Sequence, residues 1–490
     1  MNQFKLRELE SLLQSAVSYT EWRDIAVEHD RVSGMSDWCS EEESPLYDNA
    51  LIRDHLQILL QLMKDREDVN LLQTLNEGIH GNLGGMGSPE LYQRAKFGTK
   101  SLVTEYIDAV IGALDIVHNS NHPALSFSQK VDFFRRASHC FGRSALMLSG
   151  GATQGIFHIG VVKSLLEENL LPKVISGASA GSVIAATVAT HSDDELKDIL
   201  HRDQLRFETM KFLGWSNILQ GVPLLDAQHL ESALSEYVED LTFEEAYQKT
   251  KRNLNICISP ARYQQESRML NAISSPSVHI RKGVMASCAV PGLFPPVTLT
   301  AKNIHGETHQ YNPRRQWVDG SLSNDQPSKR LTRIYGVNHY IASQTNPHVV
   351  PFIAEKGGKK TVASAIGSFG AKTTKQLVSH ILKVGRGKIT SPVLGVALTQ
   401  IHALVSQDYT ADIVLYPPYR FINPLKLFVD PTPERINQLI LEGERATWPK
   451  IEMIRNCTKI SRKLDEILSQ YDIKEREKML GQGDLSVLTP

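Results

Sequence analysis

The spacing of hydrophobic residues changes near residue 144, and this change predicts two kinds of structure in one chain. Before it, apolar residues recur every three or four positions, which is typical of amphipathic helices. The clearest example is Leu51, Ile52, Leu56, Leu59, Leu60 and Met63. Further along, Ser88-Pro89-Glu90 places a cap, a first-turn proline and an acid in order, and it predicts another helix. Residues 1–140 are therefore expected to form a helical domain.

Beyond residue 144, short apolar runs alternate with stretches of helical period. The runs cover residues 145–148, 174–175, 254–258, 317–318, 340–342 and 413–415. Two capping boxes mark helix starts between them, Ser192 with Glu195 and Thr242 with Glu245. Strands separated by helices indicate an α/β layered core with a mostly parallel central sheet.

The length of 490 residues allows two or three domains. We expect the helical domain over 1–140 to be followed by an α/β core over 141–345. Residues 346–470 are expected to complete that core and to end in helices, because the pattern after Pro433 is again helical and charged. The tail over 471–490 is expected to fray.

Composition excludes several classes of function. The net charge is −1, with no local basic reading motif, so no nucleic-acid partner is expected. Five scattered cysteines form no CxxC pair and no HExxH is present, so we expect no metal and no cofactor. The N-terminus is charged where a signal peptide is apolar, and the uncharged stretches 144–162, 174–192 and 389–406 contain glycine, serine or proline. These features predict a cytoplasmic protein that is soluble or peripheral at a membrane.

The sharpest chemical signal is Gly177-Ala178-Ser179-Ala180-Gly181, a GxSxG pattern. An apolar strand leads into it and a helix of small residues over 183–190 leaves it, which is the arrangement of a nucleophile elbow. The two glycines are expected because the turn is strained and the helix passes close to the strand. Ser179 is therefore the candidate nucleophile. The alternative is a glycine-rich packing turn with an inert serine.

A second glycine-rich turn, Ser149 to Gly155, lies between the strand 145–148 and a helix that starts near Gly155. Backbone N–H groups at a helix start can bind an anion, so this turn is a candidate for an oxyanion hole. The turn lacks the GxxxxGK[ST] pattern of a phosphate loop, and Ala152 breaks the GxGxxG pattern of a dinucleotide site.

A serine nucleophile also needs a base, and Asp319 follows a short strand and precedes Gly320. A carboxylate is a poor base toward a serine hydroxyl, so Asp319 has to be desolvated or its proton transfer coupled to oxyanion stabilisation. A Ser-Asp-His triad is the alternative, and the chain order admits His339 or His348. Each of these histidines, and His158 near the glycine-rich turn, also fits a structural or surface role.

Together these motifs resemble the patatin-like phospholipase family, and within it the storage-triacylglycerol lipases of fungi and plant seeds. The similar segments are 155–162, 286–292, 317–321 and 343–348. Residues 82–85 and 98–100 resemble the helical domain of unknown function that precedes the catalytic domain in that branch. The resemblance covers roughly residues 15–465 and implies a three-layer patatin-like core.

The resemblance implies a Ser-Asp dyad without histidine, in which Ser179 is the nucleophile and Asp319 its base. The same resemblance implies an oxyanion hole at Gly150, Gly151 and Ala152 and four motif glycines, Gly155, Gly177, Gly181 and Gly320.

The implied activity is that of a lipid acyl hydrolase that cleaves fatty-acyl esters of acylglycerols through an acyl-enzyme. Gln154 stands where many phospholipases of the family carry Arg or Lys, which favours a neutral glyceride over a phospholipid. Phospholipase A activity, acyl transfer to another alcohol, and a lipid-binding scaffold without turnover remain alternatives.

A basic segment offers a contact to the lipid surface. Residues 356–407 contain eight basic residues and no acid, with apolar residues between them. Such a segment predicts a basic amphipathic surface for anionic lipid, with Lys372, Lys375 and Lys383 as candidates. A solvated helical face or a mobile loop is the alternative. We therefore expect a peripheral protein at a membrane or lipid droplet; the sequence leaves the oligomeric state open.

Overall fold

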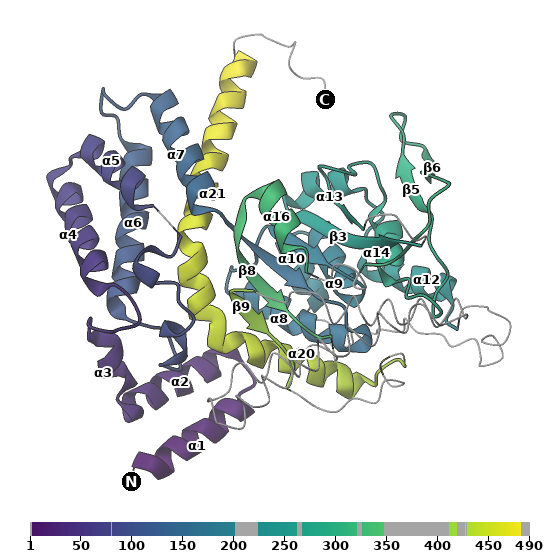
Figure 1. The fold of residues 1–490 in the computed structure, drawn as a ribbon, viewed down its shortest axis with the longest axis horizontal. Coiled ribbons are helices and arrows are strands. Elements are labelled where there is room, and N and C mark those ends of the chain that lie inside the picture. Colours follow the sequence, from purple (N-terminus) through teal and green to yellow (C-terminus); the bar gives the residue numbers. More distant parts are fainter. Residues whose placement is uncertain are drawn as a thin grey trace, which may run out of the picture. The chain divides into compact units, whose positions relative to one another are not determined.

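A computed structural model describes residues 2–79, 81–200, 224–261, 267–320, 326–346, 411–418, 427 and 429–481 (Figure 1). The chain divides into two compact units. Unit 1 comprises Met1–Ser144, Ile334–His339 and Trp448–Pro490, and unit 2 comprises Ala145–Arg333 and Tyr340–Thr447.

Unit 1 is helical, as the periodicity predicted. Its α-helices are α1 (Asn2–Ser15), α2 (Tyr19–Ser33), α3 (Met35–Ser40), α4 (Asn49–Asp65), α5 (Asp68–Gly78), α6 (Ser101–Asn119), α7 (Phe127–Phe141) and α21 (Ile451–Gly481). Helix α6 is the centre of this unit, because it packs against α4, α5 and α21. The predicted stripe over 51–63 lies on α4, where Ile52, Leu56 and Leu59 are buried. Among the described helices, none is both long enough and apolar enough to span a membrane.

The helix expected after Ser88-Pro89-Glu90 is wrong in length, because only the single 3-10 turn η2 (Leu91–Gln93) forms there. The carboxylate of Asp30 accepts the N–H groups of Lys96 and Phe97, at 2.9 and 2.8 Å. These N–H groups are the ones that a longer helix needs for its own carbonyls. A side chain from α2 therefore ends the helix, which no local pattern predicts.

Lys100 of unit 1 is fully buried, at 0% exposure. Its Nζ donates to the carbonyls of Trp38, Glu41 and Glu43, at 2.6, 2.8 and 3.4 Å, and lies 4.0 Å from the centroid of the Trp38 ring. Burial lowers the pKa of this amine. The three carbonyls lie at and beyond the carboxyl end of α3, where helix carbonyls lack backbone partners. Lys100 thus joins the start of α6 to the end of α3.

We expect Lys100→Met to lower the free energy of unfolding of unit 1 by about 3 kcal/mol, because it leaves three carbonyls without a donor while filling the same space. Urea unfolding and hydrogen exchange across α3 measure the effect. Lys96→Met is the matched control, since the Lys96 side chain is exposed and the variant should unfold as the wild type does. Unchanged exchange in α3 in Lys100→Met contradicts the expectation.

Unit 2 is built on a mostly parallel sheet in the order β4-β3-β2-β1-β8-β9, with β7 also paired to β3. The strands are β1 (Arg143–Leu148), β2 (Val174–Gly177), β3 (Asn253–Pro260), β4 (Arg268–Leu270), β7 (Trp317–Asp319), β8 (Val337–Ser343) and β9 (Ile413–Leu415). Pairs β1–β2, β2–β3 and β8–β9 are parallel, whereas β4 and β7 run antiparallel to β3. All six predicted runs are strands, and the α/β layered core is confirmed. The sequence did not predict β4.

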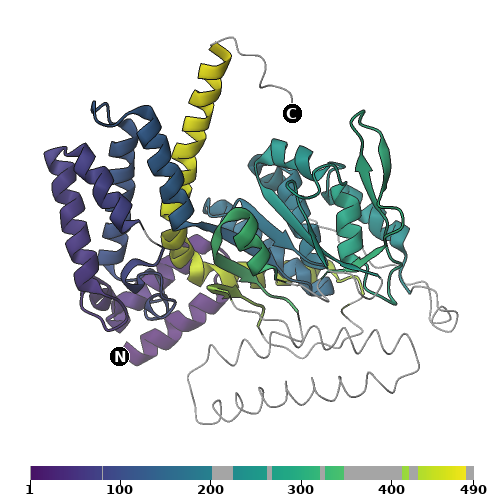
Figure 2. The same ribbon diagram turned by 45° about the horizontal axis from the view of Figure 1, so that its top comes forward.

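The helices of unit 2 lie between and around these strands (Figures 1 and 2). They are α8 (Phe157–Glu167), α9 (Ala180–Thr190), α10 (Asp193–Leu200), α12 (Ala227–Tyr237), α13 (Phe243–Thr250), α14 (Ile280–Cys288), α16 (Ser328–Tyr335) and α20 (Pro433–Thr447). Both predicted capping boxes form, at Ser192 and at Thr242. A separate hairpin of β5 (Leu299–Lys302) and β6 (Thr308–Tyr311) projects from the unit in both views.

Helices α8 and α20 cross at two glycines. A Cβ on Gly160 would lie within 3.0 Å of the backbone of Ile440 and Glu444, and one on Gly443 would meet the carbonyl of Phe157. Lys163 and Glu444 form an ion pair of 2.6 Å beside the crossing. Since α8 begins directly after the glycine-rich turn, this crossing fixes the helix on which that turn rests.

Candidate active site

Ser179 occupies the sharp turn between β2 and α9. Its backbone has φ 50° and ψ −127°, a strained conformation for a residue with a side chain. The Ser179 N–H donates to Ser287 Oγ at 2.9 Å, and that hydroxyl donates to the carbonyl of Cys257 at 2.7 Å. On the other side, Ser182 Oγ donates to the Ser179 carbonyl at 2.6 Å. Both the N–H and the carbonyl of Ser179 are therefore held by hydrogen bonds, which stabilise the strained turn.

The glycines of the elbow are required by close approach of backbone. A Cβ on Gly177 would lie within 3.0 Å of Gly181 and Ser182, and one on Gly181 would overlap the carbonyls of Leu148 and Ser149. Helix α9 therefore starts in contact with the ends of both β2 and β1. This close approach is the reason for which the sequence predicts both glycines.

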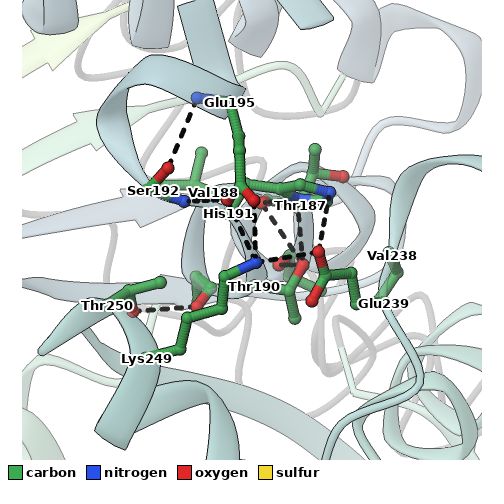
Figure 3. A network of polar contacts seen from close by, with 12 residues as sticks. Thr187, Val188, Thr190, His191, Ser192, Glu195, Val238, Glu239, Lys249 and Thr250 are labelled. Atoms are coloured by element: carbon green, nitrogen blue, oxygen red, sulfur yellow. Dashed lines mark hydrogen bonds and ion pairs between the residues drawn. The ribbon is translucent and has the colours of Figure 1, made fainter.

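The carboxyl end of α9 is fixed as firmly as its start. Arg252 Nη1 donates to the carbonyls of Val188 and His191, at 2.8 and 2.7 Å, and Thr250 Oγ1 donates to that of Ala189 at 2.9 Å. Figure 3 shows the polar network around this end of the helix. Donors at the last carbonyls satisfy groups that have no partner within a helix. Both ends of the helix that carries Ser179 are thus anchored to the rest of unit 2.

Asp319 ends β7, and strand register places it just beyond the end of β2. Ile258 of β3 pairs with Arg268 of β4 on one edge, so its pairing with Asp319 uses the other edge. That second edge is the one that pairs with β2, where Gly177 lies opposite Ile256. Asp319 therefore occupies the position in the sheet that β2 leaves free when its chain turns away.

The last turn of α14 and the residue directly after it hold the backbones of both candidate residues. Ser179 donates its N–H to Ser287, and Asp319 donates its N–H to the carbonyl of Ala289 at 3.0 Å. Ser179 is 9% exposed and Asp319 is 1% exposed. The structure thus holds the backbones of a strained serine and a buried carboxylate, far apart along the chain, two residues apart on one segment.

Cys288 lies between Ser287 and Ala289, and the pKa of its thiol responds to the charge of Asp319. Burial, followed by the nearby Asp319 carboxylate, raises the pKa of its thiol to about 12. Its Sγ lies 3.9 Å from Ser182 Oγ. The carboxylate is therefore close to the first turn of α9, and the thiol stays protonated at neutral pH.

The glycine-rich turn lies against the start of α9. Residues Ala152–Ile156 form the 3-10 turn η3, and Ala152 has φ 49°. A Cβ on Gly155 would lie within 3.0 Å of the Cβ of Ala180, the residue after Ser179. Within the described residues, the N–H groups of Gly151 and Ala152 have no hydrogen-bond acceptor. The turn therefore presents backbone donors beside the elbow.

A Cβ on Gly320 would lie within 3.0 Å of the backbone of Cys257 and Ile258, so this glycine lets β7 and its Asp319 end lie close to β3. The sequence did not predict a role for Ser287 or Ser182. Ser287 lies in the segment 286–292 that is similar to the lipases, and Ser182 directly follows the GxSxG pattern.

Of the two histidines proposed for a triad, His339 lies near the start of β1 and His348 lies outside the described residues. His339 Nδ1 bonds Ser144 Oγ at 2.8 Å, near the start of β1, whereas the glycine-rich turn follows the end of that strand. His348 and the candidates Lys372, Lys375 and Lys383 lie outside the described residues, as does the stretch 389–406.

Two parts of the chain match known families. Residues 2–139 match a domain of unknown function (DUF3336), and residues 146–329 match the patatin-like phospholipase family.

Similar proteins come from fungi and plants. The chain is 34% identical to triacylglycerol lipase 4 of Saccharomyces cerevisiae, over 93% of this chain and 52% of that protein. It is 32% identical to triacylglycerol lipase SDP1L of Arabidopsis thaliana, over 96% and 59%. It is 30% identical to triacylglycerol lipase ptl3 of Schizosaccharomyces pombe, over 92% and 94%. The chain thus spans about half the length of the first of these relatives and nearly all of the third.

Among solved structures, VipD from Legionella pneumophila is similar with a TM-score of 0.30 and 15% identity, over 68% of each chain, a likeness too weak to support an argument. The sequence relatives are stronger evidence, because their similarity runs through both the helical region and the sheet. The chain belongs to the patatin-like phospholipase family, in the group whose patatin domain follows a DUF3336 domain.

Proposed function

We propose that this protein is a lipid acyl hydrolase that cleaves fatty-acyl esters of acylglycerols through an acyl-enzyme on Ser179. The observation that supports the proposal is that Ser287 and Ala289, two residues apart, hold the backbones of Ser179 and Asp319, and that both of these residues are nearly excluded from water. A strained serine at a helix start and a desolvated carboxylate are the two parts that nucleophilic ester cleavage needs.

The reaction follows from these groups. Ser179 Oγ attacks the ester carbonyl carbon while Asp319 accepts the hydroxyl proton, and the amides of Gly150, Gly151 and Ala152 stabilise the oxyanion. The C–O bond to the glyceride then breaks, and the leaving alcohol takes the proton from Asp319. A water molecule, deprotonated by Asp319, then attacks the acyl-enzyme. The bond from the acyl carbon to Ser179 Oγ breaks, Oγ takes the proton back from Asp319, and the fatty acid leaves.

Two observations support a neutral glyceride as the substrate. Gln154 is buried in the glycine-rich turn and stands where many phospholipases of the family carry Arg or Lys. The three similar proteins from Saccharomyces cerevisiae, Arabidopsis thaliana and Schizosaccharomyces pombe are all named triacylglycerol lipases. Phospholipase A activity and acyl transfer use the same dyad and remain alternatives within this proposal.

The location of the protein follows from the substrate. Triacylglycerols are insoluble in water and collect in droplets, so the enzyme has to act at a lipid surface, and we propose a peripheral cytoplasmic protein. The basic segment 356–407 is our candidate for that contact on its charge alone. The domain boundaries that the sequence predicts at residues 140, 345 and 470 likewise stay a prediction.

Purified protein should release fatty acid from emulsified trioleoylglycerol faster than from dioleoyl phosphatidylcholine vesicles, because no cation is supplied by position 154. A fluorophosphonate probe should label the protein, and mass spectrometry should place the adduct on residue 179. Faster release from phosphatidylcholine would assign phospholipase activity instead. Folded wild type that neither releases fatty acid nor reacts with the probe would favour the lipid-binding scaffold.

A further inference from the structure

His158 lies directly beneath the glycine-rich turn and is fully buried, at 0% exposure. It is the second residue of α8. Its Nε2 is 2.9 Å from the carbonyl oxygen of Ser149, and its Nδ1 is 2.7 Å from Ser343 Oγ. Thr345 Oγ1 lies 3.3 Å from Nε2. The reaction proposed above leaves this buried ring without a role.

The partners determine which ring nitrogen carries the proton. The Ser149 carbonyl can only accept a hydrogen bond, so Nε2 has to be protonated. Burial lowers the pKa of His158 to about 4, so the ring is neutral at neutral pH. In a neutral ring the other nitrogen is bare, and Nδ1 therefore accepts the hydroxyl proton of Ser343. The ring thus accepts a hydrogen bond from Ser343 at the end of β8 and donates one to Ser149, the residue after β1.

The hydrogen bond from His158 to the Ser149 carbonyl also affects the N–H group of the next residue. The C=O of Ser149 and the N–H of Gly150 belong to one planar trans peptide group and point in opposite directions. When His158 holds the carbonyl, the direction of the Gly150 N–H is fixed as well. This N–H is one of the three proposed oxyanion donors.

The next peptide group is held in the same way. The Gly150 carbonyl accepts hydroxyl donors from Ser149 Oγ at 3.1 Å and Thr345 Oγ1 at 3.3 Å. Ser149 Oγ in turn accepts the N–H of Thr345 at 2.8 Å. Since the Gly150 carbonyl and the Gly151 N–H share one plane, these bonds fix the second donor. The turn is rich in glycine, so without such bonds its peptide planes can rotate with little steric resistance.

We propose that His158 is a positioning residue of the oxyanion hole, which directs the Gly150 N–H by holding the Ser149 carbonyl, while Ser343 holds the other side of its ring by donating to Nδ1. The proposal rests on the proposed hydrolase function. It assigns no chemical step to the histidine, which differs from the triad alternatives at His339 and His348.

Three variants test this role with p-nitrophenyl butyrate as the substrate. His158→Leu should lower kcat by about 100-fold and leave KM within about threefold, because misdirected oxyanion donors weaken the transition state and not substrate binding. His158→Gln should stay within about tenfold of wild type, since its side-chain amide can donate to the Ser149 carbonyl. Ser343→Ala should lower kcat by about tenfold, because Nδ1 loses its donor.

Ser164→Ala is the matched control. Ser164 is buried on the same helix, and within the described residues its hydroxyl has no partner. This variant should keep the kcat of wild type. Nitrogen-15 spectra of the histidine rings give a readout that does not depend on turnover, and at pH 7 they should show His158 neutral with its proton on Nε2.

The outcomes separate the two proposals. An inactive wild type overturns the proposed function before any variant is made. An active wild type with an unchanged kcat in His158→Leu overturns the positioning role, as does an equal loss in His158→Leu and His158→Gln when both are folded. A ring that is protonated on Nδ1 at pH 7 overturns the hydrogen-bond assignment. If His158→Leu does not fold, His158→Gln and Ser343→Ala with the nitrogen-15 spectra decide the question.

Discussion

Replacing Ser179 by alanine is expected to lower ester hydrolysis on the order of 10⁵-fold and to abolish fluorophosphonate labelling, because the only proposed nucleophile is lost. The residual rate would come from the oxyanion donors and from substrate binding. Fatty-acid release and probe labelling measure the two losses independently. Labelling that persists in Ser179→Ala would mean that another residue reacts with the probe.

A glycine at the same position tests the strain in the elbow. Ser179 has φ 50°, a region that glycine reaches freely and that costs other residues about 1 kcal/mol or more. Ser179→Gly should therefore be as inactive as Ser179→Ala but more stable to heat. Equal stability of the two variants would show that the turn stores no strain.

Ser176→Ala is the matched control for both variants. Ser176 lies on β2, is buried, and its hydroxyl has no partner within the described residues. Its replacement should leave hydrolysis and labelling unchanged. A loss of activity in this variant would indicate that removing any buried hydroxyl near the elbow disturbs the site.

Asp319→Asn is expected to lower kcat by about 10³-fold, because asparagine has nearly the same shape but cannot accept the serine proton. Labelling by the fluorophosphonate should slow as well, since that reaction also needs an activated hydroxyl. KM should change little, because the substrate need not bind the carboxylate. Steady-state rates and the rate of labelling measure these effects.

The control for the change from carboxylate to amide is Asp194→Asn on α10, whose side chain is 97% exposed. It should behave as wild type. If Asp319→Asn keeps full activity, the base is a different group, and His348 becomes the first histidine to replace. His339 is a weaker candidate, because its ring bonds Ser144 near the start of β1.

Much of the fold was predictable because its signals are local. The strands of unit 2 are short apolar runs between helices of regular period, and the capping box at Thr242 depends on residues three positions apart. The pattern GxSxG also carries its own explanation, since Gly177 and Gly181 meet each other across one turn. The single 3-10 turn after Glu90 was not predictable, because Asp30 stops the helix from a distant position in the chain.

The sequence by itself determined the class of the core, the strained serine, the glycine-rich turn and the candidate carboxylate, because each depends on neighbours within a few positions. Only the tertiary structure decided that Asp319 lies where β2 ends, that Ser287 and Ala289 receive both proposed catalytic residues, and that His158 holds the Ser149 carbonyl. These contacts join residues that are far apart along the chain. Their geometry depends on strand register and on which helix packs beside which strand, and no local period of the sequence encodes either.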